Sequence, residues 1–252
     1  MLVATITALI ILFSGGYEIF FAENVEKGIK EYVLEKDRKK ELLDMTKGIK
    51  NGAKAYNKER KANYKDFKDL YTNYNSDQAE LEAFFNNLTE IQKAYQGDFI
   101  EKRIQITDKI TDEEWKLIVQ SSEEAYQKKL DKLAKKKSKT KDPFEKTRKK
   151  ISEVPDSQSQ AQLLEQLDSF TEKISEFEKS MKEVNVFENE LLVQKTNSKQ
   201  DLLTLYDDMN EIRQKAFSHV IGFHQSVRSN VNEEQGEAIL STFYKDLEIA
   251  PM

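Results

Sequence analysis

Cysteine is absent from this sequence of 252 residues, which also contains only 2 His, 8 Gly and 3 Pro. The absence of cysteine excludes disulfides, thiol catalysis and cysteine-based metal or iron–sulfur sites. Because Gly and Pro supply turns, their scarcity leaves little material for a compact sheet protein. Together with 34% charged residues, this composition predicts a helix-rich, elongated protein.

The common catalytic and nucleotide-binding motifs are missing as well. The sequence has no Gly-x-Gly-x-x-Gly, Walker loop, Gly-x-Ser-x-Gly or Glu-x-x-His pattern. Its two histidines, His219 and His224, are five residues apart. On one helix they would therefore point about 140° apart and would not face one metal ion. We expect a protein that is not an enzyme and has no catalytic residue, no cofactor and no metal site.

Arginine is scarce relative to lysine, at 6 residues against 34. Arg is the usual side chain for bidentate recognition of phosphates and bases, and Lys is a poor substitute for it. The formal net charge of −5 is also unfavourable for a nucleic-acid-binding domain. These features disfavour sequence-specific nucleic acid as a partner.

Long apolar runs are confined to the N-terminus. Residues 2–22 carry a single charge, on Glu18, and a stretch of that length can span about 30 Å of hydrocarbon as a helix. Aromatic side chains at its end suit the membrane–water boundary. We predict a transmembrane helix in a membrane anchor over residues 1–24, with interface residues Tyr17, Glu18, Phe20 and Phe21.

Two alternatives to the anchor remain. The run could be a cleaved signal peptide with a small-residue site at Ser14-x-Gly16, although basic residues do not precede it. It could also be a buried helix of a soluble protein. The lysines that follow the run favour a cytoplasmic C-terminal part, but long domains are exported regardless of such charges. The side of the membrane on which the C-terminal part lies is therefore left open. That part is periplasmic if the chain is exported.

Apolar residues at spacings of three, four and seven predict one amphipathic helix from Val25 to Tyr74, continuing from the membrane span as a stalk. Asp77 with Glu80 forms a capping box for a second helix. A second box, formed by Thr111 and Glu114, then opens a third helix that contains Trp115. Three helices joined by short loops pack most simply as an antiparallel bundle.

Residues 127–150 form a basic segment with a local net charge of +9. We interpret residues 141–155 as a basic hinge between two modules. The segment is either a solvated linker or a contact for an anionic surface, such as lipid head groups, an acidic partner or another copy. The candidate partner-binding residues of the chain are Lys135, Lys136, Lys137, Lys149, Lys150 and Trp115.

A heptad pattern follows over residues 163–191, from Leu163 through Phe170 and Phe177 to Leu191. This seam favours packing against the next helix of the same chain, and homo-oligomerisation through it is the alternative. A further helix follows at Leu202–Phe223. Asn232 with Gln235 caps the last helix.

An offset of 121 residues relates the two parts of the chain. Residues 81–119 align with residues 202–240, including both capping boxes. Among the identical pairs, Leu81, Glu90, Ile91, Glu113 and Ile118 meet Leu202, Glu211, Ile212, Glu234 and Ile239. The agreement favours an internal duplication, because a shared helical period alone does not easily align the boxes too.

The sequence predicts an all-α protein with an N-terminal transmembrane helix and two tandem, elongated, coiled-coil-like three-helix modules. The modules are residues 25–140 and 156–252, and the architecture resembles the tandem bundles of spectrin-type rods. We expect a non-catalytic structural subunit, membrane-anchored, acting as a spacer or adaptor among other subunits of a membrane or envelope complex. The alternatives are an exported periplasmic protein that coats or stabilises a filament or envelope machine, and a holdase-type chaperone.

Overall fold

The computed structural model describes residues 16–122 and 142–248, with the side chains of residues 16–20, Tyr64, Glu178, residues 181–193 and Glu248 left undescribed. Every element in this part of the chain is a helix, which confirms the all-α prediction. The elements are α2 (Gly16–Tyr32), α3 (Lys36–Thr72), α4 (Gln78–Lys109), a helical segment over residues 112–122, α6 (Glu145–Ile151), α7 (Ser157–Val193), α8 (Lys199–Asn230) and α9 (Glu233–Glu248).

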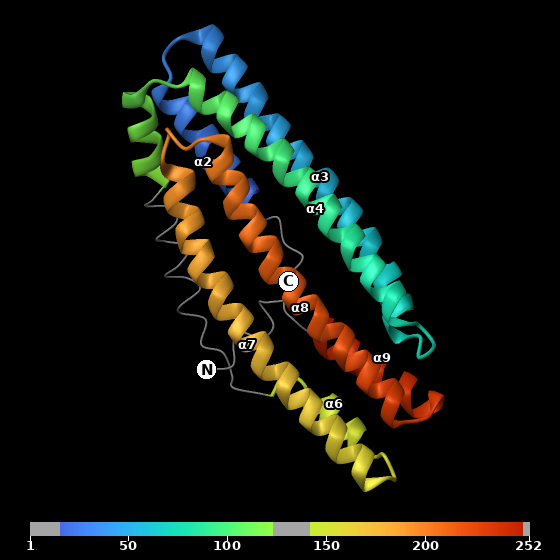
Figure 1. The fold of residues 1–252 in the computed structure, drawn as a ribbon. Coiled ribbons are helices and arrows are strands. Elements are labelled where there is room, and N and C mark those ends of the chain that lie inside the picture. Colours follow the sequence, from blue (N-terminus) through green and yellow to red (C-terminus); the bar gives the residue numbers. More distant parts are fainter. Residues whose placement is uncertain (1–15, 123–141, 249–252) are drawn as a thin grey trace.

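Two long antiparallel hairpins make up the body of the molecule (Figure 1). α3 pairs with α4, α7 pairs with α8, and α4 packs against α8 between them. α3 and α7 therefore lie on opposite flanks. Each of these two helices has 37 residues, a length of about 55 Å at 1.5 Å per residue. The short helix α2 lies near one end of the hairpins, and α6 and α9 lie toward the other.

The helix boundaries follow the offset of 121 residues found in the sequence. α3 begins at residue 36 and α7 at residue 157, and the two end at residues 72 and 193. α4 and α8 share the offset at both ends, and the segment from residue 112 corresponds to α9 from residue 233. In the described residues each half thus has two long and two short helices, where three per module were predicted.

The predicted continuous helix from Val25 to Tyr74 is wrong. The chain breaks at residues 33–35, and α2 folds back onto α3. The carboxylate of Glu35 stabilises the new start, because it accepts hydrogen bonds from the backbone N–H of Asp37 at 3.1 Å and of Arg38 at 3.2 Å. The apolar face of α2 is buried in the body as a result, so the periodicity reflected two helices that share one core.

Among residues 16–122 and 142–248, no helix combines the length and the apolar composition that a membrane span requires. Most of the predicted span, residues 2–15, lies outside the described residues. Its last residues belong to α2, where Phe21 and Ala22 are buried. The ring of Phe21 meets Phe99 edge to face at a centroid distance of 5.5 Å.

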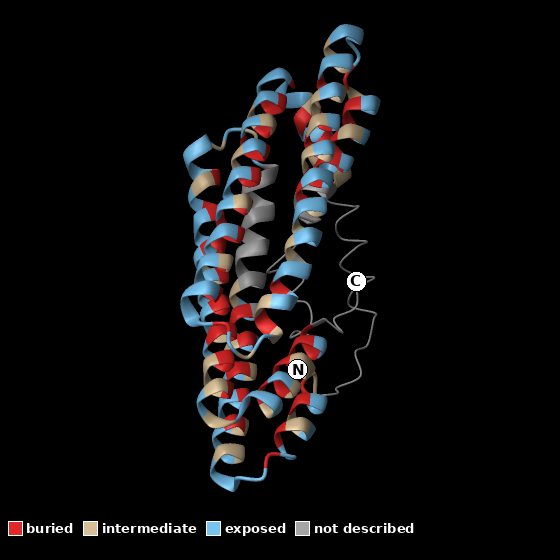
Figure 2. Cartoon of the chain, turned by 90° about the vertical axis from the view of Figure 1, so that its right-hand side faces the viewer, coloured by how far each residue is buried: buried red, intermediate tan, exposed pale blue. Residues whose placement is uncertain are grey.

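One large hydrophobic core runs through both hairpins and includes residues from Phe21 to Leu247. Figure 2 shows buried positions along the inward sides of the helices and exposed positions along their outer sides. The heptad residues of α7 that the structure describes, from Leu163 to Phe177, belong to this core, and α7 packs against α8. This confirms the intramolecular pairing for that part of the seam.

The segment predicted as a basic hinge contains α6 over much of its length. Phe144 and Ile151 are buried there, and the buried carboxylate of Asp246 on α9 accepts hydrogen bonds from Thr147 N and Oγ1 at 2.9 and 2.7 Å. Asp246 thereby caps the first turn of α6, whose own N-cap residue Phe144 has no side-chain bond to offer. The division into two separately folding modules stays a prediction.

Candidate functional site

The turn between α3 and α4 docks onto the elbow between α8 and α9. Tyr74 Oη donates to the carbonyl oxygens of Val231 at 2.7 Å and Arg228 at 3.0 Å. The guanidinium of Arg228 returns a bond to Ser76 O at 2.8 Å, and Asn75 Nδ2 donates to Glu233 at 2.6 Å. We call residues 73–77 and 228–233 the first latch, since they fasten one half of the chain to the other.

A second latch holds the corresponding turn of the other half. Arg103, fully buried on α4, donates from Nη2 to Gln194 O at 2.7 Å. His224, fully buried on α8, places Nε2 3.2 Å from Asn73 O and thereby adds to the first latch. The residue pairs 103 with 224 and 73 with 194 both follow the offset of 121. Each half therefore caps the end of the other half's long helix, and this reciprocal bonding requires the hairpins to fold together.

His224 makes the first latch sensitive to acid. Because a carbonyl oxygen only accepts hydrogen bonds, Nε2 carries the proton, and the buried Nδ1 has no hydrogen-bond partner among the described residues. Burial lowers the pKa of His224 below its usual 6.5, against the opposing effect of the bond to Asn73 O, and the charge of Arg228 lowers it further. The neighbouring ring is that of Tyr71, at a centroid distance of 5.2 Å, whose pKa burial raises.

The free energy of unfolding should therefore fall as the pH drops from about 7 to about 5. The unfolded chain takes up a proton near pH 6.5, whereas the native His224 resists protonation until the pH is lower, so acid favours the unfolded state. His224→Gln keeps a donor for Asn73 O without a titrating group, and should flatten this pH profile in urea titrations. His219→Gln is the comparison, at a half-buried ring whose pKa burial also lowers; it should flatten the profile less than His224→Gln, because its ring is only partly buried. An unchanged slope in His224→Gln would contradict the assignment.

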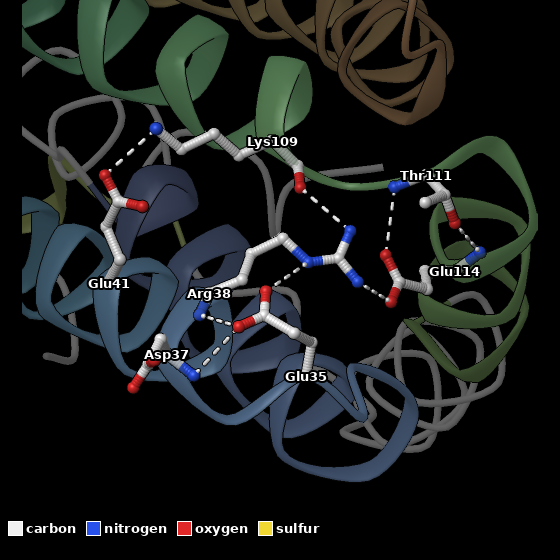
Figure 3. Close-up of polar contacts among 7 residues, drawn as sticks. All are labelled: Glu35, Asp37, Arg38, Glu41, Lys109, Thr111 and Glu114. Atoms are coloured by element: carbon white, nitrogen blue, oxygen red, sulfur yellow. Dashed lines mark hydrogen bonds and ion pairs between the residues drawn. The ribbon is translucent and has the colours of Figure 1, made fainter.

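A third polar cluster joins the start of α3 to the elbow after α4 (Figure 3). The guanidinium of Arg38 binds Glu114 Oε1 at 2.6 Å and donates to Lys109 O at 3.3 Å. The other oxygen of Glu114 accepts the backbone N–H of Thr111 at 2.9 Å, and Thr111 Oγ1 accepts the N–H of Glu114 at 3.2 Å. The predicted capping box is thus present, and its carboxylate also anchors α3.

Replacing Arg38 with alanine should lower the free energy of unfolding by about 1–2 kcal/mol, because its ion pair with Glu114 is largely shielded from water. Lys215→Ala is the matched control, since its pair with Glu211 at 2.8 Å is mostly exposed and should contribute about 0.5 kcal/mol or less. A double-mutant cycle with Glu114→Gln isolates the pair. Equal losses of stability in Arg38→Ala and Lys215→Ala would show that the cluster does not hold α3 to the elbow after α4.

Polar side chains also cross the interface between the two halves. Asn210 Nδ2 on α8 donates to Gln96 Oε1 on α4 at 2.8 Å, and Arg213 Nη1 donates to Asn210 Oδ1 at 2.9 Å. All three side chains are buried. Such a network fixes the register of two helices, because a shift would leave its groups without partners.

A groove with a volume of about 350 Å³ lies beside this interface, between α4 and α8. Its apolar floor comes from Phe85, Phe217 and Ile221, and amides such as Gln78 and Gln225 form its rim. The two phenylalanine rings stack at a centroid distance of 4.2 Å. No cluster of three potential metal ligands occurs among the residues that the structure describes, and the groove contains no nucleophile paired with a base.

The predicted site residues are not brought together. Phe21 lies in the core, the side chains of Tyr17, Glu18 and Phe20 are undescribed, and their interface role stays a prediction. Trp115 is buried, with its ring centroid 6.4 Å from that of Phe21, and its role as a partner contact stays a prediction. The fold-back of α2, which the sequence analysis missed, covers it.

The lysines predicted as partner contacts divide into two groups. Lys135, Lys136 and Lys137 lie outside the described residues. Lys149 is exposed on α6, and Lys150 pairs with Glu153 at 2.7 Å. Sequence reasoning missed the latches, whose partners are 91 to 158 residues apart and carry no local signal. It also passed over a row of lysines on α3, which the period of 3.6 residues would have revealed.

Comparisons of this chain with models of protein families, with characterised proteins and with solved structures find no match.

Proposed function

We propose that this protein is a non-catalytic structural subunit that acts as an elongated spacer or adaptor within a membrane or envelope assembly, anchored through residues 1–24. The observation that carries the proposal is the reciprocal bracing of the long hairpins. Helices of about 55 Å are fastened by contacts between the halves at residues 73 and 194. Bracing of this kind stiffens a body along its length, as a spacer between partners requires.

The groove between α4 and α8 supports a binding role better than a reaction. Its rim offers amide and hydroxyl groups. Neither histidine lines the groove, and His224 instead bonds to Asn73 O in the first latch. The polar groups of the interior serve to hold helices in register. We therefore assign the chain to interaction with other protein subunits rather than to chemistry on a small molecule.

The anchor and the assembly are tested on the full chain in its native membrane fraction. The protein should stay in the pellet after alkaline carbonate extraction, and in mild detergent it should migrate in a complex well above its own 29.4 kDa. Release by carbonate as a monomer would reject both parts of the proposal. N-terminal sequencing separates anchor from signal peptide, because a mature start at Tyr17 favours the exported alternative.

The spacer role is tested by loosening the first latch without touching the anchor. Tyr74→Phe combined with Arg228→Ala removes hydrogen bonds that join the halves, so the yield of the native complex should fall while membrane attachment is retained. Lys215→Ala, which alters an exposed pair, should leave the yield unchanged. A full yield from the latch variant would contradict the need for a braced rod. Suppression of aggregation of unrelated proteins would favour the holdase alternative.

A further inference from the structure

A straight row of lysines follows the outer face of α3. Lys47, Lys54, Lys58, Lys61 and Lys65 are separated by 7, 4, 3 and 4 residues, so all five fall within about 60° of one another around the helix axis. All five are exposed. The row points away from the core residues of the same helix, such as Ile49 and Tyr56. It is about 27 Å long at 1.5 Å per residue.

The charge of this row is not neutralised by the part of the chain that the structure describes. Between Lys47 and Lys65 the only acidic residue of α3 is Glu59, which points about 120° from the row. None of the five lysines forms an ion pair with any residue in the described part of the chain. Two other basic residues of α3 do form ion pairs, Lys50 with Glu26 and Arg38 with Glu114. The row is therefore a continuous line of unpaired positive charge on a protein whose net charge is −5.

The fold itself does not require lysine at these positions. α7 is the counterpart of α3 in the second half, with the same length and the same offset at both ends. At the corresponding positions the sequence of α7 has Asp168, Ser175, Lys179, Lys182 and Val186. The exposed row on α3 is thus a property of one half, and neither helix formation nor core packing accounts for it.

From this row we propose a binding site for a flexible linear phosphate polymer, which lies along the outer face of α3 with its phosphates against successive lysines. Ammonium groups bind phosphate oxygens through charge-assisted hydrogen bonds, and a line of them displaces the counterions of the polymer. Lysine is sufficient here because no base or sugar is read. This binding site does not depend on the spacer role, because polymer binding is a property of the purified chain and needs no other subunit.

A linear polymer fits the row better than a lipid surface does. The row is one lysine wide, and acidic residues flank its ends at Asp44 and Asp69, so its charge follows a line rather than a plane. It contains no apolar side chain that would enter a bilayer. The large hydrophobic residues exposed in the described chain, Leu34 and Leu117, lie off α3.

The experiment measures binding of fluorescein-labelled inorganic polyphosphate to the full chain by anisotropy. The test variant carries Lys54→Glu, Lys58→Glu, Lys61→Glu and Lys65→Glu. The control carries Lys116→Glu, Lys146→Glu, Lys179→Glu and Lys245→Glu, which are exposed lysines of four other elements. Both variants have the same net charge and keep residues 127–141 intact. Circular dichroism checks that both remain helical, and glutamine versions of both sets replace them if charge reversal unfolds α3.

We expect the test variant to bind at least tenfold more weakly than the natural chain, and the control to stay within about threefold. The slope of log K against log salt should drop by about 3 in the test variant, since four phosphate contacts are lost at about 0.7 each. Equal weakening in both variants, or no binding by the natural chain, would overturn the site. Vesicles containing phosphatidylglycerol form the other arm, and binding to them without binding to polyphosphate would also overturn it.

Discussion

Phe243→Ala is expected to lower the free energy of unfolding by about 3–5 kcal/mol, the usual cost of removing a fully buried phenylalanine. Phe243 on α9 has no exposed surface. Its ring lies within centroid distances of 4.3 Å of Phe223, 5.0 Å of Phe170 and 5.3 Å of Phe144, with Tyr71 at 5.8 Å. These partners come from α8, α7, the start of α6 and α3, so the cavity would open where five elements meet.

Urea unfolding followed by circular dichroism measures this loss. The midpoint should fall while the slope m stays constant, because the surface exposed on unfolding hardly changes. Leu117→Ala is the control, at a side chain that is 44% exposed, and should change stability by about 0.5 kcal/mol or less. A loss below about 1 kcal/mol in Phe243→Ala would mean that the aromatic cluster is not part of the cooperative core.

Gly236→Ala is expected to cost about 2–3 kcal/mol, although alanine is the better helix former. A Cβ atom at Gly236 would lie 2.6 Å from Tyr74 Cε2 and closer still to Cδ2. The ring has little room to retreat, because its hydroxyl is tied to Val231 O and Arg228 O. The substitution would therefore push the α3–α4 turn off the α8–α9 elbow and break the first latch.

Thermal and urea unfolding of three variants test this explanation. Gly97→Ala is the matched control, since a Cβ there would meet nothing within 4 Å, and it should stabilise the protein by up to about 1 kcal/mol. In a Tyr74→Ala background the added cost of Gly236→Ala should largely vanish, because the obstructing ring is gone. Full destabilisation in that background would rule out the steric clash with Tyr74 as the cause.

Much of the fold is readable in the sequence where local rules decide it. The capping boxes at Asp77 and Thr111 are present with their predicted bonds, since a cap involves residues only three apart. The core residues of α7 up to Phe177 follow the heptad spacing. The offset of 121 gives the boundaries of both long helices in the second half from those in the first.

The predictions that failed are those that needed the path of the chain. A helix period continues across a short break, so the residues before and after position 34 looked like one stalk, and α2 was missed. The contact of Trp115 with Phe21 was missed for the same reason, because it exists only once α2 folds back. The candidate site on α3 is visible in the spacing of its lysines. That these lysines form no ion pair with the described residues could be seen only in the folded structure.

The sequence by itself determined that this protein is helical, which faces of its helices are apolar and that its halves repeat, because each of these properties arises from neighbours within a few residues or from comparison of the chain with itself. The tertiary structure decided how the halves meet. Arg103 and His224 acquire their roles only when α4 and α8 lie side by side, since their partners, Gln194 and Asn73, belong to the opposite half. No local pattern encodes such a contact, because its free energy depends on burial that exists only after folding.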